Sequence, residues 1–380
     1  MRTIELLNKH LRKLVEMRII GIYNKKINYI FKLRPDLKAP IPDDIRRKHI
    51  NLYKSLSLPC NDKYIRFYSN VSGIIDYRYV PESLFSSRIE RVLNDCETGN
   101  HEYEDKNLID KLVNKKYLPK TLIRYIRGCF YDEDYNYLSS KQVNELLSNN
   151  KGNLIGKIAS ESSGGKGITE FIFKNGSYQS NSCEALTADW IEKNFSYYCI
   201  QNKIIQCDFS AQFNKSSVNT CRIITFRCPW DGKVVVLKSF LRLGASNSIV
   251  DNLSSGGVAV ALNKEGYLDA YAYTYKDYRK VKEHPVSKVR FQGLKHPYFK
   301  QMSEVVIEIA SNIPNHNIIS WDVVADCDGQ VKIIEMNLTA QSSDVPQLSF
   351  GPLFGEYTEK VIDWVVKHEN NSNFKHFRTF

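Results

Sequence analysis

The sequence predicts an α+β fold in which a helical N-terminal region precedes a body of strands and helices. Residues 1 to about 60 carry apolar residues at i, i+3 and i+4 spacing, which is typical of a helix with one buried side. From residue 154 onward, short β-branched runs alternate with turn residues. Near the C-terminal end, Asp328-Gly329 separates two such runs, 318–325 and 330–337, which predicts a β-hairpin.

Composition sets the limits for any function. The chain has 380 residues, of which 42% are hydrophobic, so it can bury a large core over two or three domains. Its net charge of +11 favours anionic partners: nucleic acid, a membrane surface, nucleotide phosphates or acidic sugars. A lysine-rich composition without functional meaning would give the same charge. The nine cysteines are scattered without a Cys-x-x-Cys pair, and no bilayer-spanning run or signal peptide is recognised. We therefore expect a cytoplasmic protein with reduced thiols.

The first helix is expected to dock on the protein through an apolar stripe. The stripe consists of Ile4, Leu7, Leu11, Leu14 with Val15, Arg18 with Ile19, and Ile22. Basic residues crowd its other side up to Arg34, and Pro35 ends the helix. Most such stripes face a core, so docking is the favoured interpretation, and a helix that binds a membrane surface or a partner is the alternative. Residues 61–150 are expected to be mostly helical, with a strand-like segment at 64–68, a loop into a strand at 118–122, and a polar link at 132–134 before a helix through Leu147.

A strand, a glycine-rich loop and a second strand follow. The strand 154–159 contains Lys157, the loop runs from Glu161 to Gly167, and the second strand covers 168–173. Glycine-rich tips let backbone N–H groups approach an anion closely, so the segment favours phosphate binding. It is not a Walker A loop, because the spacing differs and no helix follows. A merely flexible tip remains the alternative.

The next strands carry cations in apolar surroundings. Residues 217–226 and 233–244 are predicted to pair antiparallel around Trp230-Asp231-Gly232. Arg222, Lys238 and Arg242 interrupt them. A buried cation needs a partner, so a bound anion or an exposed sheet edge would explain them. A strand near 198–205, a loop into a strand at 250–260, an insertion at 269–300, and helices at 303–312 and 348–367 complete the order.

The hairpin 318–337 places polar groups together. With a two-residue turn at Asp328-Gly329, Val323 faces Ile334, Asp322 faces Glu335, and Ser320 faces Asn337. Two opposed carboxylates repel each other unless a cation lies between them, and oxygen ligands suit Mg²⁺. The alternative is a solvated polar face in a different register.

These features together resemble the ATP-grasp superfamily: a strand lysine, a Gly-Gly-Lys-Gly loop, a strand at 201–205, and Asp322 followed by Glu335-x-Asn337. A narrower resemblance is to the sugar-transfer-associated ATP-grasp proteins of bacterial polysaccharide (capsule and O-antigen) clusters. It rests on the blocks 217–225, 241–244, 250–252, 256–258, His284-Pro285, Trp321-Asp322 and Glu335-Met336-Asn337. It covers about Tyr79 to Trp364 and implies two α+β subdomains that clasp ATP.

The resemblance implies roles for individual residues. Lys157, and Lys106 upstream, would hold the phosphates of ATP. The lid over the triphosphate would comprise Ser162, Ser163, Gly164, Gly165, Lys166 and Gly167, and the adenine-binding hinge would comprise Gln201, Asn202, Lys203 and Ile204. The magnesium ligands would be Asp322, Glu335 and Asn337, the catalytic arginines Arg242 and Arg222, and the substrate-binding residues Asn219, Asn252 and His284. In the family a Thr-Gly usually follows His-Pro, whereas this chain has Val286-Ser287-Lys288, which leaves the role of His284 open.

The implied organisation is an N-terminal helical region (1–60), a mostly helical region (61–150), a lid subdomain (151–205), a C-terminal subdomain with the metal and substrate site (206–367) and a tail (368–380).

The implied function is an ATP-dependent carboxylate–amine ligase that forms a C–N bond in surface polysaccharide biosynthesis, with ATP and Mg²⁺ as cofactors. Its substrates would be a small-molecule carboxylate, such as a uronic acid or amino acid, and an amine, with a sugar nucleotide or glycan as a further candidate. A kinase on the same fold and a non-catalytic nucleotide-binding module of a glycan assembly complex are the alternatives. A nucleic-acid partner is not expected, and the basic N-terminal helix is a candidate contact for a membrane or a glycan-assembly partner.

Overall fold

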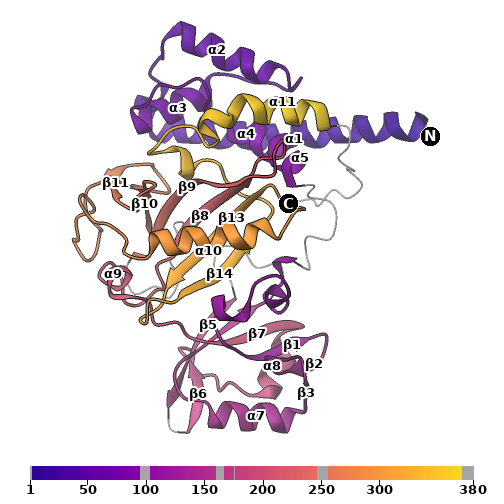
Figure 1. Ribbon diagram of the computed structural model, residues 1–380, viewed down its shortest axis with the longest axis vertical. Helices are drawn as coiled ribbons and strands as arrows, with labels where there is room; N and C mark the ends of the chain where they lie inside the picture. Colours follow the sequence, from indigo (N-terminus) through magenta and orange to yellow (C-terminus); the bar gives the residue numbers. More distant parts are fainter. Residues whose placement is uncertain (1, 95–102, 160–166, 175, 246–255, 370–380) are drawn as a thin grey trace.

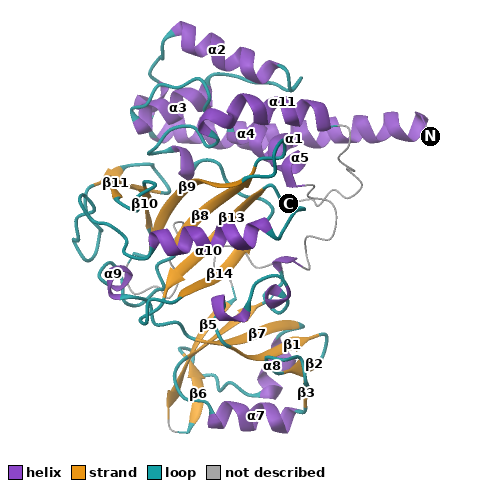
Figure 2. Cartoon of the chain, in the orientation of Figure 1, coloured by secondary structure: helices purple, strands orange, loops and turns teal. Residues whose placement is uncertain are grey.

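The computed structural model describes residues 2–94, 103–159, 167–174, 176–245 and 256–369, with the side chains described from residue 9. Figure 1 shows a layer of helices at one end, a large sheet in the middle and a smaller sheet at the other end. Figure 2 shows that helices dominate the first of these parts and strands the other two. The α+β prediction is therefore confirmed. No helix in the described residues combines the length and the apolar character needed to cross a bilayer.

The large sheet is antiparallel and has the order β12-β11-β10-β9-β8-β13-β14 in the described part of the chain. Its strands are β8 (Cys221–Arg227), β9 (Val234–Leu243), β10 (Val258–Leu262), β11 (Leu268–Thr274), β12 (Lys280–Val281), β13 (Ile318–Ala325) and β14 (Val331–Asn337). The predicted β8–β9 pair is confirmed. The insertion predicted at 269–300 is wrong at its start, because residues 269–274 belong to β11.

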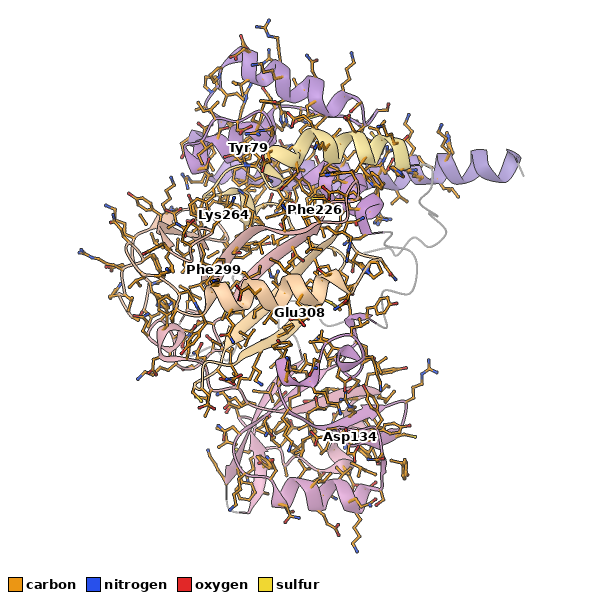
Figure 3. All side chains as sticks on the ribbon, viewed as in Figure 1. Tyr79, Asp134, Phe226, Lys264, Phe299 and Glu308 are labelled. Carbon is orange, nitrogen blue, oxygen red and sulfur yellow. The ribbon has the colours of Figure 1, made fainter. Side chains whose placement is uncertain are left out.

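Each face of the large sheet is covered by helices. The helix α10 (Phe299–Ser311) packs on one face, where Phe299 joins a core with Trp321 and Ile333. The helical layer covers the other face, where Phe226 joins a separate core (Figure 3). This layer contains α1 (Arg2–Leu33), η1 (Pro35–Lys38), α2 (Asp43–Lys54), α3 (Lys63–Ser72), α4 (Glu82–Leu84), the π-helical turn η2 (Phe85–Ile89), α5 (Glu90–Asn94), η6 (Val345–Gln347), η7 (Gly355–Tyr357) and α11 (Thr358–His368).

Two predictions for the helical layer need correction. Residues 64–68 are part of the helix α3 and not a strand, because Tyr64, Tyr68 and Val71 repeat at helical spacing and all are buried. The helix α1 does dock, but with a different side from the one predicted. Its buried residues include Ile20 and Ile27, whereas most of the predicted stripe that the structure describes is exposed.

The smaller sheet has the order β3-β2-β1-β7-β4-β5-β6 in the described residues and is also antiparallel. Its strands are β1 (Thr121–Ile126), β2 (Cys129–Tyr131), β3 (Tyr137–Leu138), β4 (Leu154–Ile158), β5 (Ile168–Lys174), β6 (Ser177–Ser180) and β7 (Tyr197–Asn202). The helices α7 (Ser140–Asn149) and α8 (Ala188–Asn194) contribute to one core with the sheet.

The predicted boundary at residue 150 therefore cuts through this sheet. Strands β1 to β3 come from 121–138, and β1 pairs along its length with β7. The predicted entry into a strand at 118–122 is confirmed by β1, whereas β2 and β3 lie in a part expected to be a polar link and a helix. Short turns, η3 (Ile109–Lys111) and η4 (Lys115–Tyr117), lead into β1, and α9 (Asp208–Ala211) follows the crossing from β7 to the large sheet.

The hairpin β13–β14 has the predicted pairs at its site end but a different turn. Asp322 pairs with Glu335 and Ser320 with Asn337, as predicted, whereas Val323 pairs with Ile333 and not with Ile334. The N–H of Asp326 donates to the carbonyl of Gln330 over 2.9 Å, so the loop between them has three residues. The longer turn shifts the register by one residue, and a bulge at Ile334 shifts it back.

The loop after β14 is held by three glutamates from the N-terminal part of the chain. Glu104 accepts the backbone N–H groups of Leu338 and Thr339, Glu90 that of Gln341, and Glu82 that of Ser343, over 2.6–3.0 Å. Glu82 and Glu90 are buried. Next to them, Asp344 accepts bonds of 2.5 Å from Lys26 of α1 and Tyr68 of α3. The helical layer therefore fixes the loop that leaves Asn337.

This clamp predicts a pH dependence of stability. Burial raises the pKa of Glu90 to about 8, whereas the pKa of a glutamate in an unfolded chain is about 4.3. The folded state binds this proton more tightly, so the stability is full below about pH 4.3 and declines as the pH rises through about 8, by up to about 1.4 kcal/mol per unit. Glu90→Gln cannot ionise, so we expect it to reduce the fall in Tm between about pH 6 and about pH 9.

Thermal unfolding followed by circular dichroism measures this effect. Glu265→Gln, at an exposed position, is the matched control and should leave the pH dependence unchanged. A Glu90→Gln variant whose Tm falls as steeply as that of the wild type would show that Glu90 does not titrate in this range.

Candidate active site

Two lysines and a carboxylate meet where the smaller sheet faces the large one. Lys106 Nζ lies 3.1 Å from Glu335 Oε1 on β14, and the N–H of Lys106 donates to the carbonyl of Ala159 at the end of β4. Burial, together with the charge of Lys106, lowers the pKa of Lys157 on β4, while Glu335 acts in the opposite sense. The fold thus brings together three residues that the sequence predicted for phosphate and metal binding.

The charge of Lys157 is offset only in part within the described residues, by Glu335. Its side chain is buried, and in the described part of the chain it forms no salt bridge. An ammonium group in a low-dielectric environment is costly unless an anion pairs with it. Lys106 adds a second positive charge close by. The position is therefore suited to a polyanionic ligand such as a string of phosphates.

The described part of the glycine-rich loop is its last residue, Gly167. Ser162, Ser163, Gly164, Gly165 and Lys166 lie outside the described residues. Gly167 has a φ of +74°, and a Cβ there would lie 2.4 Å from the side chain of Ile158. Its carbonyl accepts the N–H of Ile158. A glycine is thus required where the loop rejoins the sheet beside Lys157.

Two arginines from neighbouring strands hold Asp322. Arg222 of β8 donates from Nε and Nη2 to the two carboxylate oxygens over 2.7 and 2.5 Å, and Arg242 of β9 donates to Oδ2 over 2.8 Å. Burial alone would raise the pKa of Asp322, but the charges of Arg222 and Arg242 outweigh it and the pKa falls below its usual range. The predicted catalytic arginines therefore lie side by side, and their shared partner is a predicted metal ligand.

The three predicted magnesium ligands have different surroundings. The side chain of Glu335 is 34% exposed, and Asn337 donates its amide N–H to the carbonyl of Ser320, which leaves its oxygen as the donor atom for a cation. Asp322 is already bonded to two guanidinium groups. Among the described residues no three His, Cys, Asp or Glu side chains form a metal-binding group, so a cation here also needs substrate oxygens. Glu335 and Asn337 fit Mg²⁺ in this way.

The predicted hinge borders a cavity of about 420 Å³ between the two sheets. Asn202, Lys203 and Ile204 line it, together with residues of β1 and the turn of the β13–β14 hairpin. Gln201 is buried and donates to Thr121, and Lys203 forms a salt bridge of 2.7 Å with Glu170. Neither Lys157 nor Glu335 is among the lining residues, so the cavity and the lysine cluster are separate parts of the interface.

Two predicted substrate-binding residues are structural. Asn219 is buried, and its side chain bonds Ser210, Asn214, Gln206 and the N–H of Gly244. His284 is also buried: one ring nitrogen bonds the carbonyl of Gly244, and the other accepts from Ser287. Neither side chain can meet a substrate in this arrangement, because every polar atom is already used. The third residue, Asn252, lies outside the described part of the chain.

The network around Gly244 includes residues that the sequence did not single out. Gln206, just after the hinge, donates to the carbonyls of Asn214 and Ser217 and accepts the N–H of Asn219. Asn214 donates to the carbonyl of Gly244. These groups fix the end of β9 directly after Arg242. Their partners are distant in sequence, so no local pattern indicates them.

The contribution of the ion pairs of Asp322 with Arg222 and Arg242 to stability can be tested by substitution. Asp322→Asn keeps the shape of the side chain but removes the negative charge that two largely buried guanidinium groups share. We expect the variant to lose about 3 kcal/mol of unfolding free energy, because breaking a buried ion pair on one side is costly. Urea unfolding measures this change. Asp363→Asn, an exposed position on α11, serves as the control, and equal stability of the two variants would show that the cluster gives no net stabilisation.

Comparison with known proteins agrees with the resemblance seen in the sequence. The profile of the sugar-transfer associated ATP-grasp family matches residues 85–361, a span that includes every predicted site residue. A search of curated proteins finds no match.

Distant similarities to solved structures are found as well. An ADP complex of N5-carboxyaminoimidazole ribonucleotide synthetase is 10% identical with a TM-score of 0.41, over 68% of this chain and 52% of that chain. VanG D-Ala:D-Ser ligase from Enterococcus faecalis is 15% identical with a TM-score of 0.38, over 70% and 61%. An L-amino acid ligase from Bacillus licheniformis is 14% identical with a TM-score of 0.38, over 72% and 50%.

The chain thus spans less than two thirds of each of these three proteins, and at these TM-scores the similarities carry no conclusion about activity. The family profile, in contrast, covers well over half of the chain and both sheets. On this match the chain belongs to the sugar-transfer associated ATP-grasp family.

Proposed function

We propose that the protein is an ATP-dependent ligase that joins a carboxylate to an amine. The observation that carries the proposal is the meeting of Lys106, Lys157 and Glu335 between the two sheets. A buried lysine that forms no salt bridge in the described part of the chain, next to a second lysine, calls for a polyanion. The carboxylate beside them supplies a ligand for the cation that accompanies ATP.

Each group has a defined task in this proposal. Lys106 and Lys157 bind the phosphates and neutralise their charge. Glu335 and Asn337 would hold Mg²⁺, which when bound would supply positive charge that offsets the charge of the phosphates. Arg222 and Arg242 orient the second substrate and stabilise negative charge on the group being transferred. Asp322 fixes the two arginines at the required distance from Glu335. Phosphoryl transfer needs positioning and charge neutralisation and no side-chain nucleophile.

The chemistry has two balanced steps. A carboxylate oxygen of the substrate attacks the γ-phosphorus, the bond to the β-phosphate oxygen breaks, and ADP leaves. The product is an acyl phosphate. The neutral amine then attacks the acyl carbon, the C–O bond to phosphate breaks, and inorganic phosphate and one proton are released with the amide.

The substrate class follows from charge and family. The protein carries a net charge of +11, which favours an acidic substrate, and the family is described as associated with sugar transfer. We therefore propose a uronic acid, or an amino acid destined for a glycan, as the carboxylate in surface polysaccharide biosynthesis.

A reaction panel tests the proposal directly. The protein is incubated with Mg·ATP and with pairs of substrates, each made of one carboxylate (a uronic acid or an amino acid) and one amine. The release of ADP and phosphate and the masses of the products are then measured. The expected result is ADP and phosphate release with a new amide mass. A stable phosphate ester without free phosphate would instead identify a kinase. ATP binding without turnover on any pair would identify a non-catalytic binding module.

A substitution at Glu335 links the activity to this site. Glu335→Gln should abolish Mg·ATP turnover and leave the Tm nearly unchanged, because the side chain is partly exposed and its shape is kept. Glu308→Gln, at an exposed position on α10, should retain full activity. Turnover by Glu335→Gln at the wild-type rate would exclude Glu335 as a metal ligand.

Lys157 gives a test that does not need the substrate. Lys157→Met removes a buried charge, so we expect the ligand-free variant to be more stable by about 1–3 kcal/mol. The same change should weaken ADP binding by about tenfold or more, since a charge-assisted contact to phosphate is lost. Thermal unfolding and calorimetric titration measure the two effects. Lys174→Met, exposed at the end of β5, should change neither, and unaltered ADP affinity in Lys157→Met would contradict the phosphate role.

A further inference from the structure

The long helix α1 has an apolar face that packs against nothing in the described residues. Its members are Leu11, Leu14, Ile22, Tyr29 and Leu33, which are between 42% and 61% exposed. They are separated by 3, 8, 7 and 4 residues, spacings that keep side chains on one side of an α-helix. From Leu11 to Leu33 the face is about 33 Å long, at 1.5 Å per residue. We call these five residues the outer face of α1.

The outer face is not needed to attach the helix. The opposite side of α1 does that with Ile20, Ile27, Ile30 and Phe31, all buried in the cores of the helical layer. A helix on the surface of a soluble domain normally has one apolar side. Here a second one is open to solvent, and Figure 1 shows the N-terminal part of α1 extending beyond the rest of the layer.

The charges around the outer face are of one sign. Three exposed basic residues lie beside it on the helix, Arg18, Lys25 and Lys32, which follow Leu11 by 7, 14 and 21 residues. Between residues 9 and 33 the sequence has a single acidic residue, Glu16. That residue is buried and forms salt bridges with Arg12 and Arg88. The exposed surface of this stretch is therefore apolar and cationic with no acidic group.

We propose that the outer face of α1 binds the surface of an anionic phospholipid bilayer. The helix would lie parallel to the membrane, with the apolar side chains at the boundary between headgroups and acyl chains and the lysines and Arg18 at lipid phosphates. Apolar and basic residues on one exposed helix face are the chemistry of such surfaces. A second copy of the chain fits less well, because two faces with the same positive charge repel each other.

Vesicle co-sedimentation with the full chain tests the proposal without nucleotide or substrate, so its outcome is independent of the proposed activity. The vesicles contain phosphatidylcholine alone or with about 30% phosphatidylglycerol. We expect binding to the anionic vesicles only, weakened by salt. The double variant Leu14→Gln/Ile22→Gln should bind about tenfold more weakly, because two apolar side chains no longer enter the bilayer.

The control variant is Tyr137→Gln, an equally exposed aromatic residue on β3 of the smaller sheet, and it should bind as the wild type does. Circular dichroism checks that the variants are folded, which is expected because the substituted side chains are exposed. Failure of the wild type to bind anionic vesicles would overturn the proposal. Equal binding by the double variant would overturn it too. So would a dimer in sedimentation velocity that the double variant dissociates, since the face would then join two copies.

Discussion

The arrangement of the site depends on one buried carboxylate and the two guanidinium groups that compensate it. Asp322 lies between Arg222 on its directly paired strand and Glu335 on the other side of β13. Arg242 reaches the same carboxylate from one strand further. Because a buried charge without a partner is costly, the three strands cannot slide past one another without losing these contacts. The strand register that keeps the charge of Asp322 paired is thus also the register that places the two arginines and Glu335 close to one another.

Contacts between residues close in the sequence could be predicted, whereas contacts between distant residues could not be predicted from local patterns. The pairing of Asp322 with Glu335 was predictable because a hairpin is local and side chains alternate with period two. The prediction was correct for an incomplete reason: the turn has one residue more than expected, and a bulge at Ile334 compensates for it. The salt bridge from Lys106 to Glu335 joins residues 229 positions apart, and only the family resemblance pointed to it.

Burial is the property that the sequence conveyed least well. Asn219 and His284 looked like substrate ligands because they are polar residues in blocks typical of the family, yet both are buried supports for Gly244. Their partners are backbone groups and an amide side chain on other elements, which no spacing rule reveals. In α1 the sequence showed an apolar periodicity correctly but not which of two apolar sides is covered. The start of β1 was predicted from the loop at 118–122, whereas β2 and β3 were missed because they have only three and two residues.

The contacts of Glu82, Glu90 and Glu104 with the loop after β14 have a consequence for how this ATP-grasp module could be transferred to another protein. The family profile begins at residue 85, but Glu82, Lys26 and Tyr68, which hold Ser343 and Asp344, all precede it. A graft limited to the matched span would carry the lysines, the carboxylates and the arginines, yet leave Asp344 and the N–H of Ser343 without these partners. The helical layer is therefore part of the smallest portion of this chain that could move to another protein as a working unit.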